Sequence, residues 1–238
     1  MPTVLVTRPQ PDADHLAQVM REKNFDVIVD PLFKTDFATT PPERENYQAL
    51  LATSRNAIRA LAKNGAVKYF SHLPLLAVGE ETATEARLAG FKHIKNAEGA
   101  ADSLGALVVE TCLPGKGPLL YLAGKTRKAA LESGLAAQGF EIAVWEAYAM
   151  HPSPALNEKT LGALRQNAVA AVLLFSERAA AHFLQLAQAL DWENVNAPLY
   201  ACLSAQVALP LQNKGLRAIY PSIPSLHALI ELLPPKNH

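Results

Sequence analysis

The stretches LATSRNAIRALA (residues 51–62) and LLFSERAAAHFL (residues 173–184) share one design. In each, a short apolar run ends on a serine, Ser54 or Ser176, and an alanine-rich helical pattern begins at the next residue. Serine is a preferred N-cap because its hydroxyl oxygen accepts a hydrogen bond from a backbone N–H of the first helical turn. Each stretch therefore predicts a buried strand that leads directly into a helix.

The rest of the chain repeats in the same order around these two stretches. Four further pairs of segments match: VLVTR (4–8) with LLYLAG (119–124), FDVIVDPL (25–32) with FEIAVWEAY (140–148), LLAVGEETATEARLAGFKHI (75–94) with LYACLSAQVALPLQNKGLRAI (199–219), and DSLGALVVE (102–110) with SLHALIELL (225–233). The pattern indicates duplication of a unit of about 115–120 residues, which is the size of one α/β domain.

Within each copy, apolar runs of about four to six residues alternate with helical patterns of about 10–15 residues, as in βαβ units with a parallel sheet. Runs such as AAVLLF (170–175) are apolar throughout, which predicts strands covered on both faces. We therefore expect an α/β protein with two small doubly wound parallel-sheet domains.

Two domain boundaries fit the repeat. A simple tandem would place the boundary near LPGKGP (113–118). Alternatively, the extended runs VIVDPLFKTDF (27–37) and IAVWEAYAMHP (142–152) could cross between the domains, because ten extended residues span roughly 33 Å. Paired antiparallel, they would form a two-stranded linker. Domain 1, flavodoxin-like, would then comprise residues 1–35 and 150–238, and domain 2 residues 36–149.

The composition limits the partners. The 238 residues include 22 Lys and Arg and 22 Asp and Glu, so the formal charge is zero and no broad basic surface for nucleic acid is expected. No apolar run reaches the roughly 18–20 residues of a membrane span, and MPTVLVTRPQ enters a strand pattern at once. Cys112 and Cys202 lie in apolar stretches, as buried free thiols do. We expect a cytoplasmic protein with neither nucleic-acid nor membrane partners.

The predicted strand ends are suited to anions. Ligands of open α/β sheets bind at the carboxyl ends of strands, where helix N-termini offer unpaired N–H groups to a carboxylate or phosphate. Hydroxyl groups, glycines and cations gather at or near these ends: Thr7, Arg8, Thr53, Ser54, Gly79, Thr82, Gly124, Lys125, Arg127, Ser176, Arg178 and Ser204. For any single serine or threonine, helix capping alone is the alternative reading.

Motifs of cofactor, metal and nucleophile chemistry are incomplete. AGKTRK (123–128) contains the GKT of a P-loop without its glycine-rich loop, and no GxGxxG follows a strand. The histidines form no i,i+4 pair and no cysteine cluster accompanies them, which disfavours zinc. Ser54 and Ser176 lack the GxSxG elbow of a nucleophile. We predict no cofactor and no metal.

Ordered segments along nearly the whole chain resemble the uroporphyrinogen-III synthase family. They are VLVTRPQPDADHLAQVMREKNFDVIVDPLF (4–33), ATSRNAI (52–58), AVGEETATEARLAGF (77–91), LYLAGKTRKAALESGLAAQGFEIAVWEAY (120–148) and LLFSERAA (173–180). The resemblance implies the crossed domain arrangement. It also implies a lyase of heme biosynthesis that cyclises hydroxymethylbilane, a linear tetrapyrrole octacarboxylate, to uroporphyrinogen III with inversion of ring D and loss of water.

The resemblance further implies roles for single residues. AVGEETA supplies the family's glycine and threonine as Gly79 and Thr82, and TSRNA supplies Thr53 and Ser54. Tyr148 stands where the family has a tyrosine bordering its cleft, and we expect it to be the proton donor. The second copy departs from the pattern, with Ser204 for the glycine and Val207 for the threonine, so a hydroxyl contact from position 207 is not expected.

On this reading the protein is a monomer that receives its substrate from hydroxymethylbilane synthase. Two rival functions stay open at this point. One is a non-catalytic binding module for an anionic metabolite on the same fold. The other is a two-domain transferase with a nucleotide-activated donor, which the missing glycine-rich phosphate loop disfavours.

Overall fold

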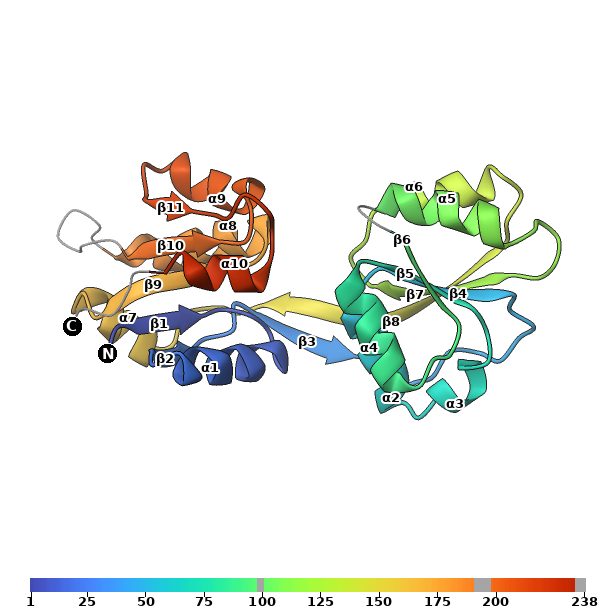
Figure 1. Cartoon of the computed structure of the whole chain (residues 1–238), viewed down its shortest axis with the longest axis horizontal. Helices are drawn as coiled ribbons and strands as arrows, with labels where there is room; N and C mark the ends of the chain where they lie inside the picture. Colours follow the sequence, from blue (N-terminus) through green and yellow to red (C-terminus); the bar gives the residue numbers. More distant parts are fainter. Residues whose placement is uncertain (98–100, 191–197, 234–238) are drawn as a thin grey trace. The chain divides into compact units, whose positions relative to one another are not determined.

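The computed structural model describes residues 1–97, 101–190 and 198–233 of the chain. The chain divides into two compact units, unit 1 with Met1–Lys34 and His151–His238, and unit 2 with Thr35–Met150. Both boundaries fall inside strands, β3 (Phe33–Phe37) and β8 (Ile142–Pro152) (Figure 1). The segment 113–118, where a tandem boundary would lie, is internal to unit 2.

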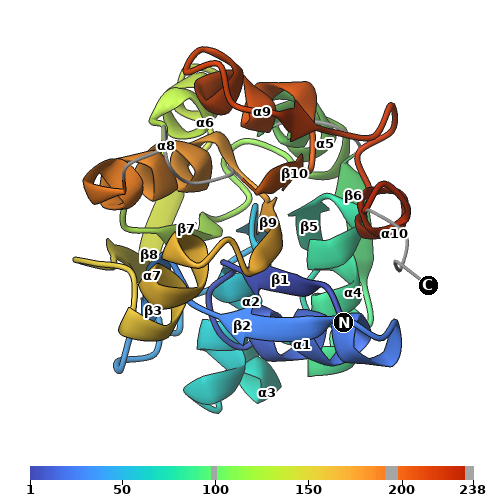
Figure 2. The same ribbon diagram turned by 90° about the vertical axis from the view of Figure 1, so that its left-hand side faces the viewer.

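Unit 1 is built on a sheet whose described strands are all paired in parallel. Its strand order is β2 (Asp26–Val29), β1 (Thr3–Val6), β9 (Val169–Leu174), β10 (Leu199–Cys202) and β11 (Ala218–Ile219). Figure 2 shows the first four of these strands in succession. The helices of this unit are α1 (Asp12–Glu22), α7 (Glu158–Arg165), α8 (Glu177–Leu186), η1 (Ala187–Ala189), α9 (Ala205–Gln212) and α10 (Leu226–Glu231).

Side chains on both faces of this sheet are buried, as the continuous apolar runs predict. On one face, Val4 and Leu173 belong to a core cluster with Leu16 of α1 and Leu229 of α10. Successive strand residues point to opposite faces. Tyr200 of β10 accordingly contacts the ring of Phe183 in α8 on the other face, with 5.8 Å between ring centroids.

Unit 2 has a second sheet, in the order β3, β8, β7 (Leu119–Gly124), β4 (Ala49–Ala52), β5 (Leu75–Val78) and β6 (Ile94–Ala97). From β8 to β6 the pairs are parallel. β3 lies beside β8 and runs in the opposite direction, and Ala38 N donates a hydrogen bond to Ala147 O (2.9 Å) (Figure 1). The helices of this unit are α2 (Arg55–Lys63), α3 (Val67–Phe70), α4 (Glu80–Ala89), α5 (Ala101–Thr111) and α6 (Ala130–Ala136).

Neighbouring leucines of β4 show the doubly wound packing of unit 2. Leu50 belongs to the core cluster that contains Ile58 of α2 and Ala83 of α4. Leu51 belongs to the cluster that contains Leu104 of α5 and residues of α6. Helices therefore cover both faces of the sheet, and the predicted two-domain α/β fold with an antiparallel two-stranded linker is confirmed.

The two sheets have the same order once the chain is permuted. Read from β1, unit 1 has the flavodoxin-like order 2-1-3-4-5, and unit 2 has the same order when counting starts at β7 and continues from β8 to β4. Such an order places the topological switch point between the first and third strands. The switch point therefore lies between β1 and β9 in unit 1, and between β7 and β4 in unit 2.

One extended run is shorter than the sequence predicts. Residues 27–37 were expected to be continuous, but β2 ends at Val29 and β3 begins at Phe33 in the other sheet. Pro31 lies in the gap, and proline has no N–H to donate to a ladder. The next N–H, of Leu32, bonds to Thr7 O (3.2 Å), which ties the break to the end of β1.

Candidate active site

At the switch point of unit 1, the Thr7 hydroxyl forms a hydrogen bond within the sheet. Thr7 follows β1 and is only 2% exposed, and its Oγ1 donates a hydrogen bond to Leu173 O of β9 (2.6 Å). The side chain thus ties together the two strands that flank the switch point. Thr7 was predicted as a binding residue, but its buried hydroxyl faces the sheet and a ligand would have to reach the backbone beside it.

Arg8 carries positive charge to the same strand end. Its guanidinium carbon lies 4.7 Å from the centroid of the Phe175 ring, and Nη2 lies 3.1 Å from Asp12 Oδ2. Asp12 is the first residue of α1, four positions along the chain. The ion pair and the ring hold the guanidinium in place near the N-termini of α1 and α8. The Asp12 carboxylate also offsets part of the positive charge of Arg8.

Ser176 and Arg178 follow β9. Ser176 is the N-cap of α8, and its Oγ accepts a hydrogen bond from Ala179 N (3.1 Å). Arg178 is exposed and its guanidinium stacks over the ring of Phe33, 4.6 Å from the centroid. Ser204 has the extended conformation of an N-cap at α9 without a side-chain capping bond. The helix starts of unit 1 at the ends of β9 and β10 thus combine serines with one exposed cation.

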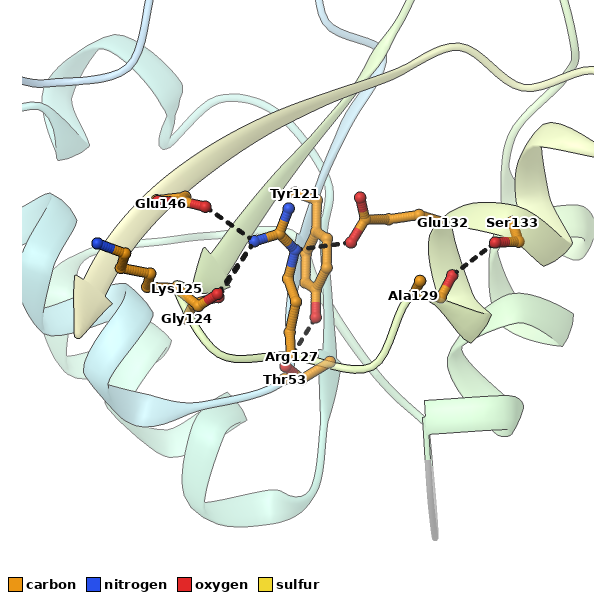
Figure 3. Close-up of polar contacts among 9 residues, drawn as sticks. All are labelled: Thr53, Tyr121, Gly124, Lys125, Arg127, Ala129, Glu132, Ser133 and Glu146. Carbon is orange, nitrogen blue, oxygen red and sulfur yellow. Dashed lines mark hydrogen bonds and ion pairs between the residues drawn. The ribbon is translucent and has the colours of Figure 1, made fainter. Parts of the chain in front are cut away.

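The switch point of unit 2 is drawn in Figure 3. Thr53, which follows β4, lies with its Oγ1 3.3 Å from the hydroxyl of Tyr121, a buried residue of β7 (Figure 3). Ser54 is the N-cap of α2, and its Oγ accepts a hydrogen bond from Asn56 N (3.2 Å). The sequence reasoning missed Tyr121, because its place beside Thr53 depends on the pairing of two strands distant in sequence.

Arg127 acts as a clamp on the loop after β7. Its Nε donates to Glu132 Oε1 (2.7 Å) and its Nη1 to Glu146 Oε1 (3.1 Å), while Nη1 also reaches Gly124 O (3.5 Å) (Figure 3). The hydrogen bond with Glu132 is the main cause that raises the pKa of Arg127. We predicted this arginine as an anion ligand, and any anion must compete with these two carboxylates for it.

Lys125 and Tyr148 lie beside this clamp. The backbone N–H of Lys125 donates to Tyr148 O (2.8 Å), and the lysine side chain is exposed. The Tyr148 ring is half-buried against the core cluster on one face of unit 2. A Cβ atom built on Gly124 would lie 3.0 Å from the Tyr148 hydroxyl oxygen. The phenol therefore lies at the carboxyl end of β7, next to the switch point.

The helix starts after β5 and β10 correspond to each other but carry different residues: Gly79 and Thr82 at α4, Ser204 and Val207 at α9. Gly79 has a φ of +79°, a conformation that glycine adopts without strain, and caps the start of α4. Thr82 is 5% exposed and its N–H bonds to Gly79 O (3.1 Å), so this backbone donor is already used within the helix start. Val207, at the corresponding place in α9, is equally buried. The change from threonine to valine thus falls on a packed position.

Two properties of the described residues bear on other functions. Across residues 1–97, 101–190 and 198–233, no three His, Cys, Asp or Glu side chains gather closely enough to hold a metal ion. In the same part of the chain, none of the helices has the length and apolar character of a membrane span.

The fold and these strand ends define a class: a protein of two doubly wound α/β units, each with hydroxyl groups, helix N-termini and cations at its switch point. The family profile for Uroporphyrinogen-III synthase HemD matches residues 14–231. The chain belongs to this family, whose members act on a small-molecule tetrapyrrole.

Solved structures agree with the fold. Uroporphyrinogen-III synthetase from Helicobacter pylori is 20% identical, with 97% of each chain covered and a TM-score of 0.66. A mutant uroporphyrinogen III synthase from Thermus thermophilus is 18% identical, with 98% of this chain and 96% of that chain covered and a TM-score of 0.61. No curated protein matches the sequence with statistical significance.

Proposed function

We propose that this chain is a uroporphyrinogen-III synthase, a lyase that converts hydroxymethylbilane to uroporphyrinogen III. The observation that carries the proposal is the family match over residues 14–231. The strand ends of both units support it, since a substrate with eight carboxylates needs many anion-binding groups. The proposal includes no cofactor and no metal.

In the proposed reaction, the hydroxyl of the substrate's hydroxymethyl group leaves as water, and its methylene carbon stays on the pyrrole. The bond between carbon and oxygen breaks, the departing oxygen takes up a proton, and the remaining azafulvene is electrophilic. The substituted end of ring D attacks it to form a spiro intermediate, which fragments and recloses with ring D inverted. The linear substrate also cyclises unaided to isomer I, so the protein must above all control the conformation of the chain of pyrroles.

Tyr148 is the residue that we propose as proton donor. A neutral phenol can donate its proton to the departing oxygen as a general acid. Its position at the end of β7, against Gly124, supports the role because substrates of this fold class bind at that edge of the sheet.

Carboxylate binding is proposed for the groups that the strand ends present to solvent. In unit 1 these are the α8 N-terminus after Ser176, Arg178 and Ser204. Arg8 is also proposed, although its side chain is only 16% exposed and pairs with Asp12. In unit 2 they are the α2 N-terminus after Ser54 and the exposed Lys125. The backbone N–H groups and Lys125 are better placed for this than Arg127, whose charge is offset by Glu132 and Glu146.

The decisive experiment supplies freshly generated hydroxymethylbilane to the purified protein and resolves the oxidised porphyrin isomers. We expect isomer III in excess over a control without enzyme. If only isomer I forms, at the rate of the control, the proposal is wrong and binding without catalysis becomes the better account.

We also propose that the protein works as a monomer in the cytoplasm and receives hydroxymethylbilane directly from hydroxymethylbilane synthase. A direct transfer would limit the unaided cyclisation of a reactive substrate. In a coupled assay, a catalytically inactive variant of this chain should then compete with the active protein for newly made substrate and raise the yield of isomer I. Light scattering of the purified chain tests the monomer.

A further inference from the structure

At the unit 2 switch point, the Tyr148 ring lies where a side chain at position 124 would project. We infer that Gly124 is a positioning residue for the proposed reaction: its missing side chain makes the space in which the Tyr148 phenol lies. The inference rests on the proposed function, because it assigns Gly124 the task of aiming the proton donor.

The distances leave no room for a side chain at position 124. A Cβ atom built on Gly124 would lie 2.9 Å from Cζ, 3.0 Å from Oη and 3.3 Å from Cε2 of Tyr148. Carbon atoms that are not bonded prefer separations of about 3.5–4.0 Å. The backbone does not demand glycine here, since Gly124 lies outside the glycines with positive φ. The Tyr148 ring is therefore what a side chain at this position would meet.

The neighbouring strands fix the phenol in this place. The register of β7 with β8 shifts between Ala123, which pairs with Glu146, and Gly124, which pairs with Tyr148. Such an irregularity brings Tyr148 one position closer to Gly124 than a regular ladder would, and bulges near active sites often redirect a side chain in this way. The bond from Lys125 N to Tyr148 O (2.8 Å) holds the end of the ladder.

The Arg127 clamp supports the same geometry. Its Nη1 lies 3.1 Å from Glu146 Oε1 on β8 and 3.5 Å from Gly124 O on β7, so one guanidinium joins the two strands next to the shift (Figure 3). Because the backbone is held in this way, a methyl group at position 124 would displace the ring. The ring can swing about its two side-chain torsions, so the fold should survive while the phenol moves.

The test is a double-mutant cycle with Gly124→Ala, Tyr148→Phe and the combined variant, assayed for isomer III. We expect Gly124→Ala to lower kcat by about 10-fold to 100-fold with little change in KM, as expected for a donor misplaced by about 1 Å. In the Tyr148→Phe background the same change should have little further effect, because no phenol remains to be aimed. Equal losses in both backgrounds would overturn the inference.

Gly134→Ala is the matched control. Gly134 lies in α6 with nothing within 4 Å of a built Cβ, so this variant adds the same methyl group in the same unit without a clash. It should leave kcat unchanged. A loss as large as that of Gly124→Ala would mean that unit 2 tolerates no such change, and would also overturn the inference.

A second readout does not depend on activity. With 3-fluorotyrosine incorporated, the ¹⁹F resonance of Tyr148 is the one that Tyr148→Phe removes. It should move in Gly124→Ala and stay in Gly134→Ala. If wild-type protein makes no isomer III, the proposed function fails while this resonance still reports whether Gly124 places the ring; if wild type is active and the resonance does not move, the inference alone fails.

If Gly124→Ala does not fold, a substitution at Tyr148 still tests the inference. Should Gly124→Ala be unfolded, the ring cannot swing aside, and combining it with Tyr148→Ala should restore cooperative unfolding by removing the clash. Failure of that second change to restore folding would show that position 124 meets something other than Tyr148.

Discussion

At the scale of single residues, the Tyr148 hydroxyl is the group whose removal tests the chemistry most directly. Tyr148→Phe keeps the ring against its core cluster and removes only the oxygen. We expect isomer III formation to fall by about 10²–10⁴-fold, the usual value of general-acid assistance, with thermal stability nearly unchanged. Tyr69→Phe, which deletes a hydroxyl of α3 in the same unit, serves as control. An unchanged rate in Tyr148→Phe would assign water loss to the reactivity of the substrate itself.

Cys202 sets a stability limit at high pH. Burial raises the pKa of the Cys202 thiol to about 12, whereas a cysteine in an unfolded chain has a pKa of about 8.5. Between these values the unfolded chain loses the proton and the folded chain retains it, so stability falls as pH rises, by up to about 1.4 kcal/mol per pH unit. Urea unfolding between pH 8 and pH 10.5 should give a shallower decline in Cys202→Ala than in wild type. Parallel declines would contradict this. Burial also raises the pKa of Tyr200, which adds to the loss of stability above about pH 10 in both proteins.

At the scale of elements, substitutions at the start of α8 can distinguish carboxylate binding by backbone N–H groups from binding by side chains. Glu177 is the first helical residue after the Ser176 cap, and its carboxylate accepts a hydrogen bond from Gln206 Nε2 (3.0 Å). Proline is tolerated at this position but has no N–H. Glu177→Pro and Glu177→Ala both remove the carboxylate, and only the first removes the donor.

If the α8 N-terminus holds a carboxylate through its N–H groups, Glu177→Pro should bind uroporphyrinogen III roughly tenfold or more weakly than Glu177→Ala, since a hydrogen bond to a charged group contributes about 1.5–3 kcal/mol. The two variants should unfold at similar temperatures. Equal affinities in two folded proteins would favour the Ser176 hydroxyl or the Arg178 guanidinium as the ligand.

At the scale of the whole molecule, the crossed chain predicts which fragment folds alone. Residues 35–150 contain a complete sheet with helices on both faces, so this fragment should unfold cooperatively in urea. The control is residues 1–115, the product of a tandem cut, which separates β4 from its partner β7 and should show no cooperative transition. Cooperative unfolding of the control without that of residues 35–150 would refute the crossed division.

Much of the fold was predictable because its signals are local. The strand, serine and helix order at Ser54 and Ser176 follows from apolar runs and capping, and both serines accept the expected backbone bonds. The extended run 142–152 coincides with β8. The run 27–37 was wrong as a single strand, because Pro31 has no N–H to pair in a ladder and the chain leaves one sheet before β3 begins in the other.

Less of the candidate site was predictable, because the partners of its side chains are distant in sequence. Thr7 donates to Leu173, and Arg127 meets Glu146 across two strands. Composition and spacing do not reveal whether a threonine or an arginine near a strand end is free to bind a ligand or is bonded to other residues of the protein.

The sequence by itself determined that this protein is a duplicated α/β chain with anion-suited strand ends, since capping and apolar periodicity act over a few residues. Only the tertiary structure decided which strand ends meet at a switch point, because that depends on a strand order that is permuted between the units. It also decided that the Tyr148 ring lies where a side chain at position 124 would project, because that placement depends on the register of two strands, and no local pattern fixes a register shift.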